Sequence, residues 1–595
     1  MIPNASNASP PAVATPLRTP VLFGQAPYRC TGWLHGHHGE LGVVICSPLG
    51  AEEECAHRSL LHVADGLAER GMVALRFDYP GCGDSEGDAA QDARLDAWIA
   101  AVEAAAAFLR RETGCTQVAL IGLRLGAALA GLAAARVDAR WLALWAPVSN
   151  GRAYSRELRA VAALGAGQAA GNAGIGVAGH LLSAEFVDAL ATLRAQDWDL
   201  RGVRRALLLE RDDASPDARL REVLHASGVE LDAQVFAGYA AMFDRPQNAE
   251  VPAAAVAGLC DWMAAQADVR QANAGQAHGD ASRRVDDERA AELGTTAYRE
   301  RRLMLGARRR LAGVLCEPPG ARASAPIVVL LNAGAVHHTG PGRLYVRLAR
   351  ELARSGVPSL RVDLSMLGDG IVAGVADEND CYADASRRDV LELLEDLRER
   401  LRFDEVVLGG LCSGAYWALQ GALDARAPGL RAVAMIHPMA IARPPQPGGG
   451  GAPDAAEALR YRQSMRSWAK WKKLLTLQAH PRAALTVLAR RASSVCTATL
   501  RELRGRLGMR PVGAVALGLR RLREQGVRVG VFVGSTEPGY LLLRQESPRE
   551  VHAGLRASAI QVFDLADCDH ALTAEAAKQR LFHAVVTFVE GLRAS

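Results

Sequence analysis

Long apolar runs, closely spaced cysteine pairs and an excess of charge of one sign are all missing from this sequence. No stretch approaches the ~20 apolar residues of a transmembrane helix, and the polar, proline-rich start lacks the basic and apolar regions of a signal peptide. We therefore expect a cytoplasmic protein with no transmembrane segment. The formal net charge of +4, from 69 basic and 65 acidic residues, predicts no nucleic-acid partner.

The 11 cysteines are scattered through the chain, and no C-x-x-C or H-E-x-x-H spacing occurs. This usage indicates reduced thiols in a reducing compartment rather than a disulfide framework. Because the usual ligand spacings are missing, the sequence predicts neither a metal site nor a cofactor.

An internal repeat divides the chain, which at 595 residues is too long for one ordinary core. In each half a buried-strand run leads through a glycine turn to a helix, and then to a strand that ends in an aspartate and a glycine-rich turn. A later strand leads to an elbow motif, GLRLG in the first half and GLCSG in the second. Matching positions keep a nearly constant separation: 285 for Asp78 with Asp363 and for Gly83 with Gly368, and 288 for Arg124 with Cys412.

Short apolar strands alternate with helical segments in both halves, which is typical of a mostly parallel sheet covered by helices on both faces. We expect a disordered N-terminus at 1–18, a first domain at 19–264, a solvated linker at 265–295 and a second domain at 296–595. The stretch RPPQPGGGGAP then opens a helical cap insertion at about 441–512 in the second domain.

Both halves resemble α/β-hydrolase domains of the serine-aminopeptidase-like or lysophospholipase-like type. The resemblance covers nearly all of the chain outside the termini and the linker, and rests on the two elbows, the RFDYPGCGDSEG block at Arg76–Gly87, the turns at Leu49–Gly50 and Ala333–Gly334, and the late Asp569-His570 pair. It implies an α/β fold with two tandem α/β-hydrolase domains, each a mostly parallel sheet flanked by helices with a helical cap insertion.

The first elbow has lost its nucleophile, because Arg124 stands at its centre. A guanidinium cannot act as an acyl nucleophile, and no histidine occurs between residues 226 and 277, where the resemblance implies a general base. We therefore predict a catalytically inactive first copy. Arg124 is expected to form a buried ion pair with the acidic cluster Glu210–Asp213, and binding of a ligand carboxylate or phosphate is the alternative.

The second elbow satisfies the pattern G-x-nucleophile-x-G only with Cys412 at its centre. A frame centred on Ser413 would need glycines where Leu and Ala stand. The elbow places the cysteine at a helix N-terminus, where the helix dipole favours a thiolate. The backbone N–H of Ser413, and that of Gly334 or Ala335 in the turn after an earlier strand, are the expected oxyanion-hole donors.

The resemblance implies His570 as the general base and Glu537 as the orienting acid, although the family usually has Asp at the latter position. The chain order of nucleophile, acid and histidine matches that of α/β-hydrolases. His337 and His338 are expected to face solvent, with substrate contact as the alternative. The repeated aspartates are expected to brace turns; they are Asp78, Asp84, Asp363 and Asp369.

A cysteine nucleophile would form a thioester, which lies close in energy to the thioesters of coenzyme A and carrier proteins, so acyl transfer competes naturally with hydrolysis. The cap carries 13 Lys and Arg against one acid between residues 460 and 510, with Trp468 and Trp471 among them. The first interpretation of this basic segment is a solvated cap helix with its tryptophans in the core. Binding of coenzyme A or an acidic acyl-carrier protein, and membrane-surface contact, are the alternatives.

The sequence thus predicts an enzyme that acts on acyl (thio)esters through Cys412, His570 and Glu537, as an acyltransferase or a thioesterase/hydrolase. The alternative is a non-catalytic tandem pseudo-hydrolase that serves as a scaffold or ligand-binding protein. Serine-type esterase or aminopeptidase activity is disfavoured, because neither elbow carries a central serine.

Overall fold

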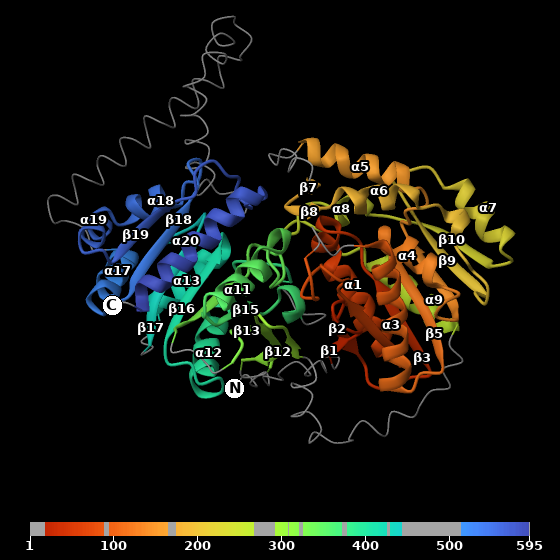
Figure 1. Ribbon diagram of the computed structural model, residues 1–595, viewed down its shortest axis with the longest axis horizontal. Coiled ribbons are helices and arrows are strands. Elements are labelled where there is room, and N and C mark those ends of the chain that lie inside the picture. The colour runs from red at the N-terminus through yellow and green to blue at the C-terminus, as the bar shows by residue number, and fades with distance from the viewer. Residues whose placement is uncertain are drawn as a thin grey trace, which may run out of the picture. The chain divides into compact units, whose positions relative to one another are not determined.

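The computed structural model divides into two compact units (Figure 1). Unit one comprises Met1–Ser324, Gly334–Ala385 and Thr573–Glu575, and unit two comprises Ala325–Ala333, Ser386–Leu572 and Ala576–Ser595. The structure describes the following residues: 18–88, 94–164, 174–266, 292–306, 309–320, 325–371, 378–424, 429–442 and 513–593.

Unit one contains an eight-stranded sheet in the order β1-β2-β4-β3-β5-β6-β9-β10. The pairs β1–β2 and β2–β4 are antiparallel, and all later pairs are parallel. The central strands are covered on both faces, which explains their continuous apolar sequences. The strands are β1 Arg18–Phe23, β2 Cys30–His35, β3 Leu41–Cys46, β4 Val73–Phe77, β5 Gln117–Leu123, β6 Ala139–Trp145, β9 Arg205–Arg211 and β10 Glu230–Phe236.

Two hydrophobic cores lie on the two faces of this sheet. Val44 packs with α3 and α4 on one face, while its neighbours Val43 and Ile45 pack with α1 and α9 on the other, as the two-residue period of a strand requires. The helices are α1 Ala51–Glu69, α3 Leu95–Thr113, α4 Leu125–Ala133, α7 Ala218–Ala226, α8 Tyr239–Met242 and α9 Ala253–Gln266.

A cap insertion lies between β6 and β9. Its two helices pack together (Figure 1), and Ser183 begins the second of them by accepting a hydrogen bond from the Phe186 N–H at 3.1 Å. The insertion consists of α5 Gly151–Leu164, β7 Ile175–Val177, β8 His180–Leu182, α6 Ala184–Thr192 and η2 Ala195–Asp197.

The second half of the chain repeats this pairing pattern. In unit one β12–β13 and β13–β15 are antiparallel, and in unit two β14-β16-β17-β18-β19 are all parallel. The strands are β11 Glu292–Gly294, β12 Arg299–Leu305, β13 Leu311–Glu317, β14 Ile327–Leu331, β15 Ser359–Asp363, β16 Val406–Leu411, β17 Leu430–Ile436, β18 Arg528–Val533 and β19 Ile560–Asp564. The helices are η4 Pro341–Arg343, α11 Leu344–Arg354, η5 Gly368–Gly370, α12 Ala385–Glu399, α13 Ser413–Asp424, α17 Ala514–Glu524, α18 Gly539–Glu546, α19 Pro548–Arg556 and α20 Glu575–Arg593.

The α/β fold with two mostly parallel, helix-flanked sheets is therefore confirmed. The predicted domain limits stay a prediction. Most of the expected N-terminal segment and linker lie outside the described residues, and so does the predicted second cap from residue 443 onward, including Trp468 and Trp471. Among the described helices, none is long and apolar enough to cross a membrane.

The turns after β4 and β15 are built alike. Asp78 accepts a hydrogen bond from the Asp84 N–H at 2.9 Å, and Asp363 accepts one from the Asp369 N–H at 3.1 Å. Asp78 and Asp363 thus brace turns as predicted, whereas the side chains of Asp84 and Asp369 face charged donors.

Gly83 is required in the first of these turns, because its φ is 46° and an added Cβ would lie 2.1 Å from Cγ of Asp78. We expect Gly83→Ala to lower the free energy of unfolding by about 3 kcal/mol or more, since strain of ~1–3 kcal/mol adds to displacement of a buried carboxylate. Urea denaturation measures the loss. Gly114→Ala is the matched control: its φ is 71° with nothing within 4 Å of the added Cβ, so equal losses would contradict the steric argument.

Candidate active site

The elbow of unit two joins β16 to α13 through Cys412. This residue has a φ of 59°, and its N–H donates to the Ile436 carbonyl on the neighbouring strand at 3.0 Å. The flanking glycines are sterically necessary, because a Cβ at Gly414 would lie 2.4 Å from the Leu331 carbonyl and one at Gly410 would lie 2.7 Å from the Gly414 backbone. The predicted frame of the motif thus fits the backbone.

Ser413 is not placed as a nucleophile. Its side chain is buried, and the hydroxyl donates to the Asn332 carbonyl at 3.2 Å. Cys412 is only partly buried and lies at the N-terminus of α13, where the helix dipole favours negative charge. Ser413 is the first residue of that helix, as expected for a backbone oxyanion donor. Gly334, with a φ of 60°, and Ala335 occupy the turn after β14, and the second donor predicted there stays a prediction.

The structure brings the three predicted side chains of unit two together. His570 lies between β19 and α20, and its Nδ1 is 2.9 Å from Oε2 of Glu537, which follows β18. Burial lowers the pKa of His570, but hydrogen bonds to Cys412 and Glu537, together with the charges of both groups, raise it to about 10. The imidazole therefore lies between a thiol and a carboxylate, as in a catalytic triad.

His437 is a further member of this site that the sequence did not reveal. It is fully buried at the end of β17, where its Nδ1 donates to the His570 carbonyl at 2.9 Å and its Nε2 accepts from the Gly534 N–H at 3.1 Å. Burial lowers its pKa, which keeps the ring neutral and suits one donor and one acceptor nitrogen. His437 thus fixes the backbone that carries His570.

The elbow of unit one holds an ion pair instead of a nucleophile. Arg124 has a φ of 53° and is 4% exposed, and its guanidinium lies 2.7 Å from Glu52 on α1 and 2.9 Å from Glu157 on α5. Burial lowers the pKa of Arg124, but Glu52 and the neighbouring groups raise it above its ordinary value. The predicted buried ion pair exists, and the cap helix α5 supplies one of its two acids.

The predicted partners of Arg124 were wrong, because the cluster Glu210–Asp213 is engaged locally. Glu210 pairs with Arg221, and Asp213 pairs with Arg211 at 2.8 Å. Asp212 accepts from the Gly238 N–H at 2.8 Å. The acid that reaches Arg124 from the cap could not be placed, since the sequence does not show how an insertion folds over the sheet.

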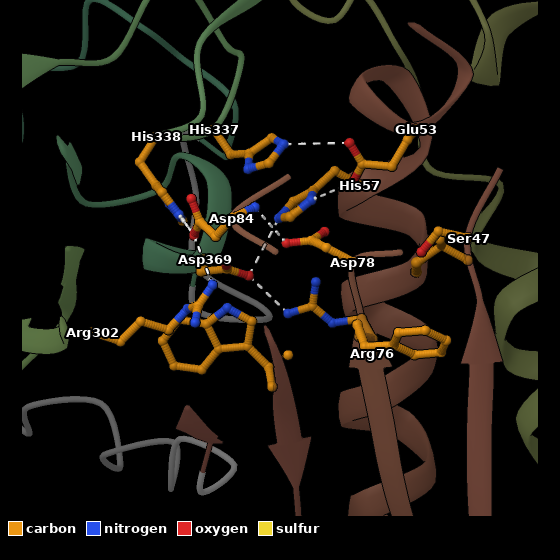
Figure 2. Close-up of a pocket in the computed structure, with 14 residues that line it drawn as sticks. Ser47, Glu53, His57, Arg76, Asp78, Asp84, Arg302, His337, His338 and Asp369 are labelled. Carbon is orange, nitrogen blue, oxygen red and sulfur yellow. Dashed lines mark hydrogen bonds and ion pairs between the residues drawn. The ribbon is translucent and has the colours of Figure 1, made fainter. Parts of the chain in front are cut away.

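A second set of ionisable groups is buried in unit one (Figure 2). His337 and His338 are 5% and 2% exposed, so the prediction of a solvent-facing pair was wrong. His338 lies 2.6 Å from Asp363 and 2.8 Å from Asp84, and burial, which lowers its pKa, is outweighed by these carboxylates, which raise it well above the ordinary value. Each histidine can be buried because its ring contacts a carboxylate from a distant part of the sequence, Glu53 for His337 and Asp84 for His338.

The charged pairs of this cluster repeat with the period of the chain. Arg76 lies 2.7 Å from Asp369, and Arg361 pairs with Asp84. Each arginine and each aspartate is separated from its counterpart by 285 positions. The arginine on each of the equivalent strands β4 and β15 thus pairs with the aspartate in the turn that follows the other strand.

Comparison with known proteins bears on the first half of the chain. Residues 43–195 match the family model described as serine aminopeptidase, S33. They form an α/β-hydrolase domain. No curated protein sequence matches significantly. Among solved structures, Est1E from Butyrivibrio proteoclasticus is similar at 17% identity, covering 42% of this chain and 98% of its own, with a TM-score of 0.31. Dienelactone hydrolase from Anabaena variabilis is similar at 12% identity, covering 50% and 98%, with a TM-score of 0.30.

The matched α/β-hydrolase domain runs from β3 through the cap to η2 and contains the Arg124 elbow. The part of the chain that matches the family thus has no nucleophile at its elbow. The constellation with a nucleophile, a base and an acid lies in the second α/β-hydrolase fold, outside residues 43–195. The chemistry must therefore be argued from the geometry of unit two.

Proposed function

We propose that unit two acts on acyl (thio)esters, with Cys412 as nucleophile, His570 as proton acceptor and donor, and Glu537 as the group that orients His570. The observation that carries this proposal is the placement of one imidazole between a thiol at a strained elbow and a carboxylate 2.9 Å away. A histidine that is protonated near neutral pH would place a positive charge beside the Cys412 sulfur, which favours a cysteine nucleophile.

The reaction would begin with attack of the Cys412 sulfur on the acyl carbon, and the carbonyl oxygen would become an oxyanion. The backbone N–H of Ser413 follows the nucleophile directly and would stabilise that charge. Collapse would expel the thiol or alcohol of the substrate, which takes a proton from His570, and would leave an acyl-cysteine. An acceptor thiol, amine, alcohol or water would then give its proton to His570 and remove the acyl group.

We favour a thioester as the acyl donor, because exchange between an enzyme cysteine and a donor thiol is nearly balanced in energy. Coenzyme A and acyl-carrier proteins are the proposed partners, because the sequence between residues 460 and 510 is rich in basic residues that would attract their negative charge. Acyl transfer and hydrolysis share the acyl-cysteine, so one experiment tests the step common to both.

The full-length protein should gain the mass of one acyl group when incubated with a panel of acyl-coenzyme A thioesters, and Cys412→Ala should gain none. Intact-mass spectrometry with peptide mapping measures the adduct. Cys568→Ser is the matched control, because Cys568 lies nearby but burial raises its pKa to about 11, and this variant should acylate like wild type. An unmodified wild type would refute the proposal and leave the scaffold function.

His437→Ala should slow acyl-cysteine formation about 10- to 100-fold without changing the site of modification, because a displaced His570 no longer aligns with the sulfur. Rapid-quench mass spectrometry gives the rate. His437→Asn retains a donor near the position of Nδ1 and should recover much of the loss. Equal rates in wild type and His437→Ala would show that the His437 contact does not position the base.

A further inference from the structure

One histidine of the buried cluster in unit one has a carboxylate at each ring nitrogen. Nδ1 of His338 lies 2.6 Å from Oδ2 of Asp363, and its Nε2 lies 2.8 Å from Oδ2 of Asp84. Both oxygens already accept another hydrogen bond, the first from the Asp369 N–H at 3.1 Å and the second from Arg302 at 2.9 Å. Oxygens placed in this way act as acceptors, so both ring nitrogens of His338 must donate.

His57 on α1 is placed in the same way (Figure 2). Its Nδ1 lies 3.0 Å from Glu53, and its Nε2 lies 3.2 Å from Oδ1 of Asp369. That Asp369 oxygen also accepts a hydrogen bond from Arg76 at 2.7 Å. Burial raises the pKa of Glu53, but His337 and His57 lower it below its ordinary value, so the proton between Glu53 and His57 belongs to the ring. Both nitrogens of His57 are therefore donors as well.

A third buried histidine of unit one shows the ordinary alternative. Nδ1 of His35 lies 2.7 Å from Asp65, but its Nε2 accepts a hydrogen bond from Nε of Arg76 at 3.1 Å. One donor nitrogen and one acceptor nitrogen describe a neutral imidazole. Burial accordingly lowers the pKa of His35 to about 4, and the ring stays neutral. His35 thus provides an internal comparison for the two doubly donating rings.

We infer that His57 and His338 are imidazolium ions that fasten unit one, and that loss of their protons at alkaline pH releases the segments they join. The inference is independent of the function proposed for unit two, because every residue concerned lies in unit one. A neutral ring has only one N–H, so its other nitrogen would direct a lone pair at a carboxylate. Deprotonation therefore replaces an attraction by a repulsion at the same contact.

The two rings join segments that are far apart in the sequence. His338 connects the turn after β14 with the end of β15 and with the turn after β4. His57 connects α1 with η5, which lies in the turn after β15. Hydrogen bonds between ionised groups are roughly twice as strong as neutral ones, so these contacts hold the segments best while the rings are charged. Loss of the protons should loosen α1 and the three turns together.

The carboxylates around the two rings favour the protonated form. Burial lowers the pKa of His57, but Asp369 on η5 and Glu53 on α1 raise it to about 9. For His338 burial is outweighed in the same way by its two aspartates, and its pKa lies well above the ordinary value. Both rings should therefore stay charged at neutral pH and lose their protons only in alkaline solution.

The other charged or titratable neighbours do not compete for these protons. His337 stacks on His57 at 4.2 Å and lies edge-on to His338 at 5.5 Å. Its Nε2 faces Glu53 and Thr339, and a neutral ring with one N–H satisfies that contact. The guanidiniums of the cluster contact the aspartates rather than these two rings; they are Arg76 from β4, Arg302 from β12 and Arg361 from β15.

The charged rings make the stability of unit one depend on pH. The pKa of each ring is higher in the folded protein than the ordinary value of about 6.5 that applies after unfolding. Their contribution is therefore complete below about pH 6.5 and is lost as the pH rises through the folded values, which for His57 is about 9. Between these limits, opening of the cluster releases one proton per ring, so its equilibrium constant rises about 10-fold per pH unit for each ring.

Hydrogen exchange of the full-length protein, corrected for the intrinsic exchange rate, measures this opening. In peptides from α1 and from the turn after β14, the opening constant of wild type should rise about 100-fold from pH 7.5 to 8.5. His57→Gln and His338→Gln should each reduce that rise to about 10-fold, because one proton is no longer released. His35→Gln is the matched control, since it replaces a buried ring that is neutral in this range, and it should keep the wild-type rise. The same rise in all four proteins would refute the inference.

The inference stays testable even where a variant fails to fold. NMR of the full-length wild-type protein with ¹⁵N-labelled histidine counts the N–H groups of each ring without any substitution. At pH 8 we expect two N–H signals for His57 and two for His338, against one for His35. A single N–H on either His57 or His338 at this pH would overturn the assignment.

Discussion

His570→Ala should slow acyl-cysteine formation in unit two by about 10³-fold, the largest kinetic effect we expect from any residue other than the nucleophile. The reason is that His570 holds the proton given up by the Cys412 sulfur and later returns it to the leaving group. Single-turnover experiments with rapid quenching and mass detection measure the rate. A residual rate above background is expected, because the elbow and its backbone donor remain.

Glu537→Gln is the informative companion of that variant. The Glu537 carboxylate is one of the groups that raise the pKa of His570 to about 10 from its ordinary value near 6.5. Without its charge the imidazole should lose its proton at a lower pH, and acylation should slow to an intermediate degree. Titration of the His570 resonance by NMR gives the shift. An unchanged titration midpoint, or a His570→Ala rate equal to wild type, would contradict the triad.

The site of unit two was predictable because much of it is local in sequence. The glycines at 410 and 414 are needed wherever an elbow brings two backbones into contact, so the frame around Cys412 can be found from a few residues. His570 and Glu537 were implied by the resemblance to α/β-hydrolases, whose chain order they match. Their distance of 2.9 Å depends on how two loops fold, which only the structure shows.

What the sequence missed depends on contacts between distant segments. His437 follows an ordinary buried strand, and nothing near it indicates that its ring supports a loop 133 positions away. The partners of Arg124 were misassigned because Glu157 comes from an insertion. His338 was expected in solvent because its acid Asp84 lies 254 positions earlier. Periodicity predicts which strands are buried, but it does not predict which polar side chains are buried beside them.

Asp84→Ala should lower the free energy of unfolding by about 3–5 kcal/mol, the largest stability loss we expect from one buried charge. The Asp84 carboxylate pairs with Arg361 and lies 2.9 Å from Arg302 and 2.8 Å from His338, and all four side chains are buried. Its removal leaves three cationic groups without their shared acid. Urea denaturation measures the loss.

Asp96→Ala is the matched control for this loss. Its partner Arg94 lies at 2.6 Å, but both side chains are largely exposed, and surface pairs contribute only about 0–1 kcal/mol. A loss at Asp84 no larger than that at Asp96 would show that the buried cluster adds nothing beyond surface pairing.

Replacing Arg361, the partner of Asp84, should lower the free energy of unfolding by less than Asp84→Ala does. The difference between the two losses tests whether Asp84 interacts with several cations at once. In Arg361→Met, Asp84 keeps Arg302 and His338, and Glu300, the second partner of Arg361, keeps Arg350 at 2.7 Å. No carboxylate is then left alone, whereas Asp84→Ala leaves several cations near one another. If both variants lost the same free energy of unfolding, Arg361 and Asp84 would interact as an isolated pair. Because Asp84 contacts three cationic groups, its removal should lower the free energy of unfolding more than removal of Arg361 does.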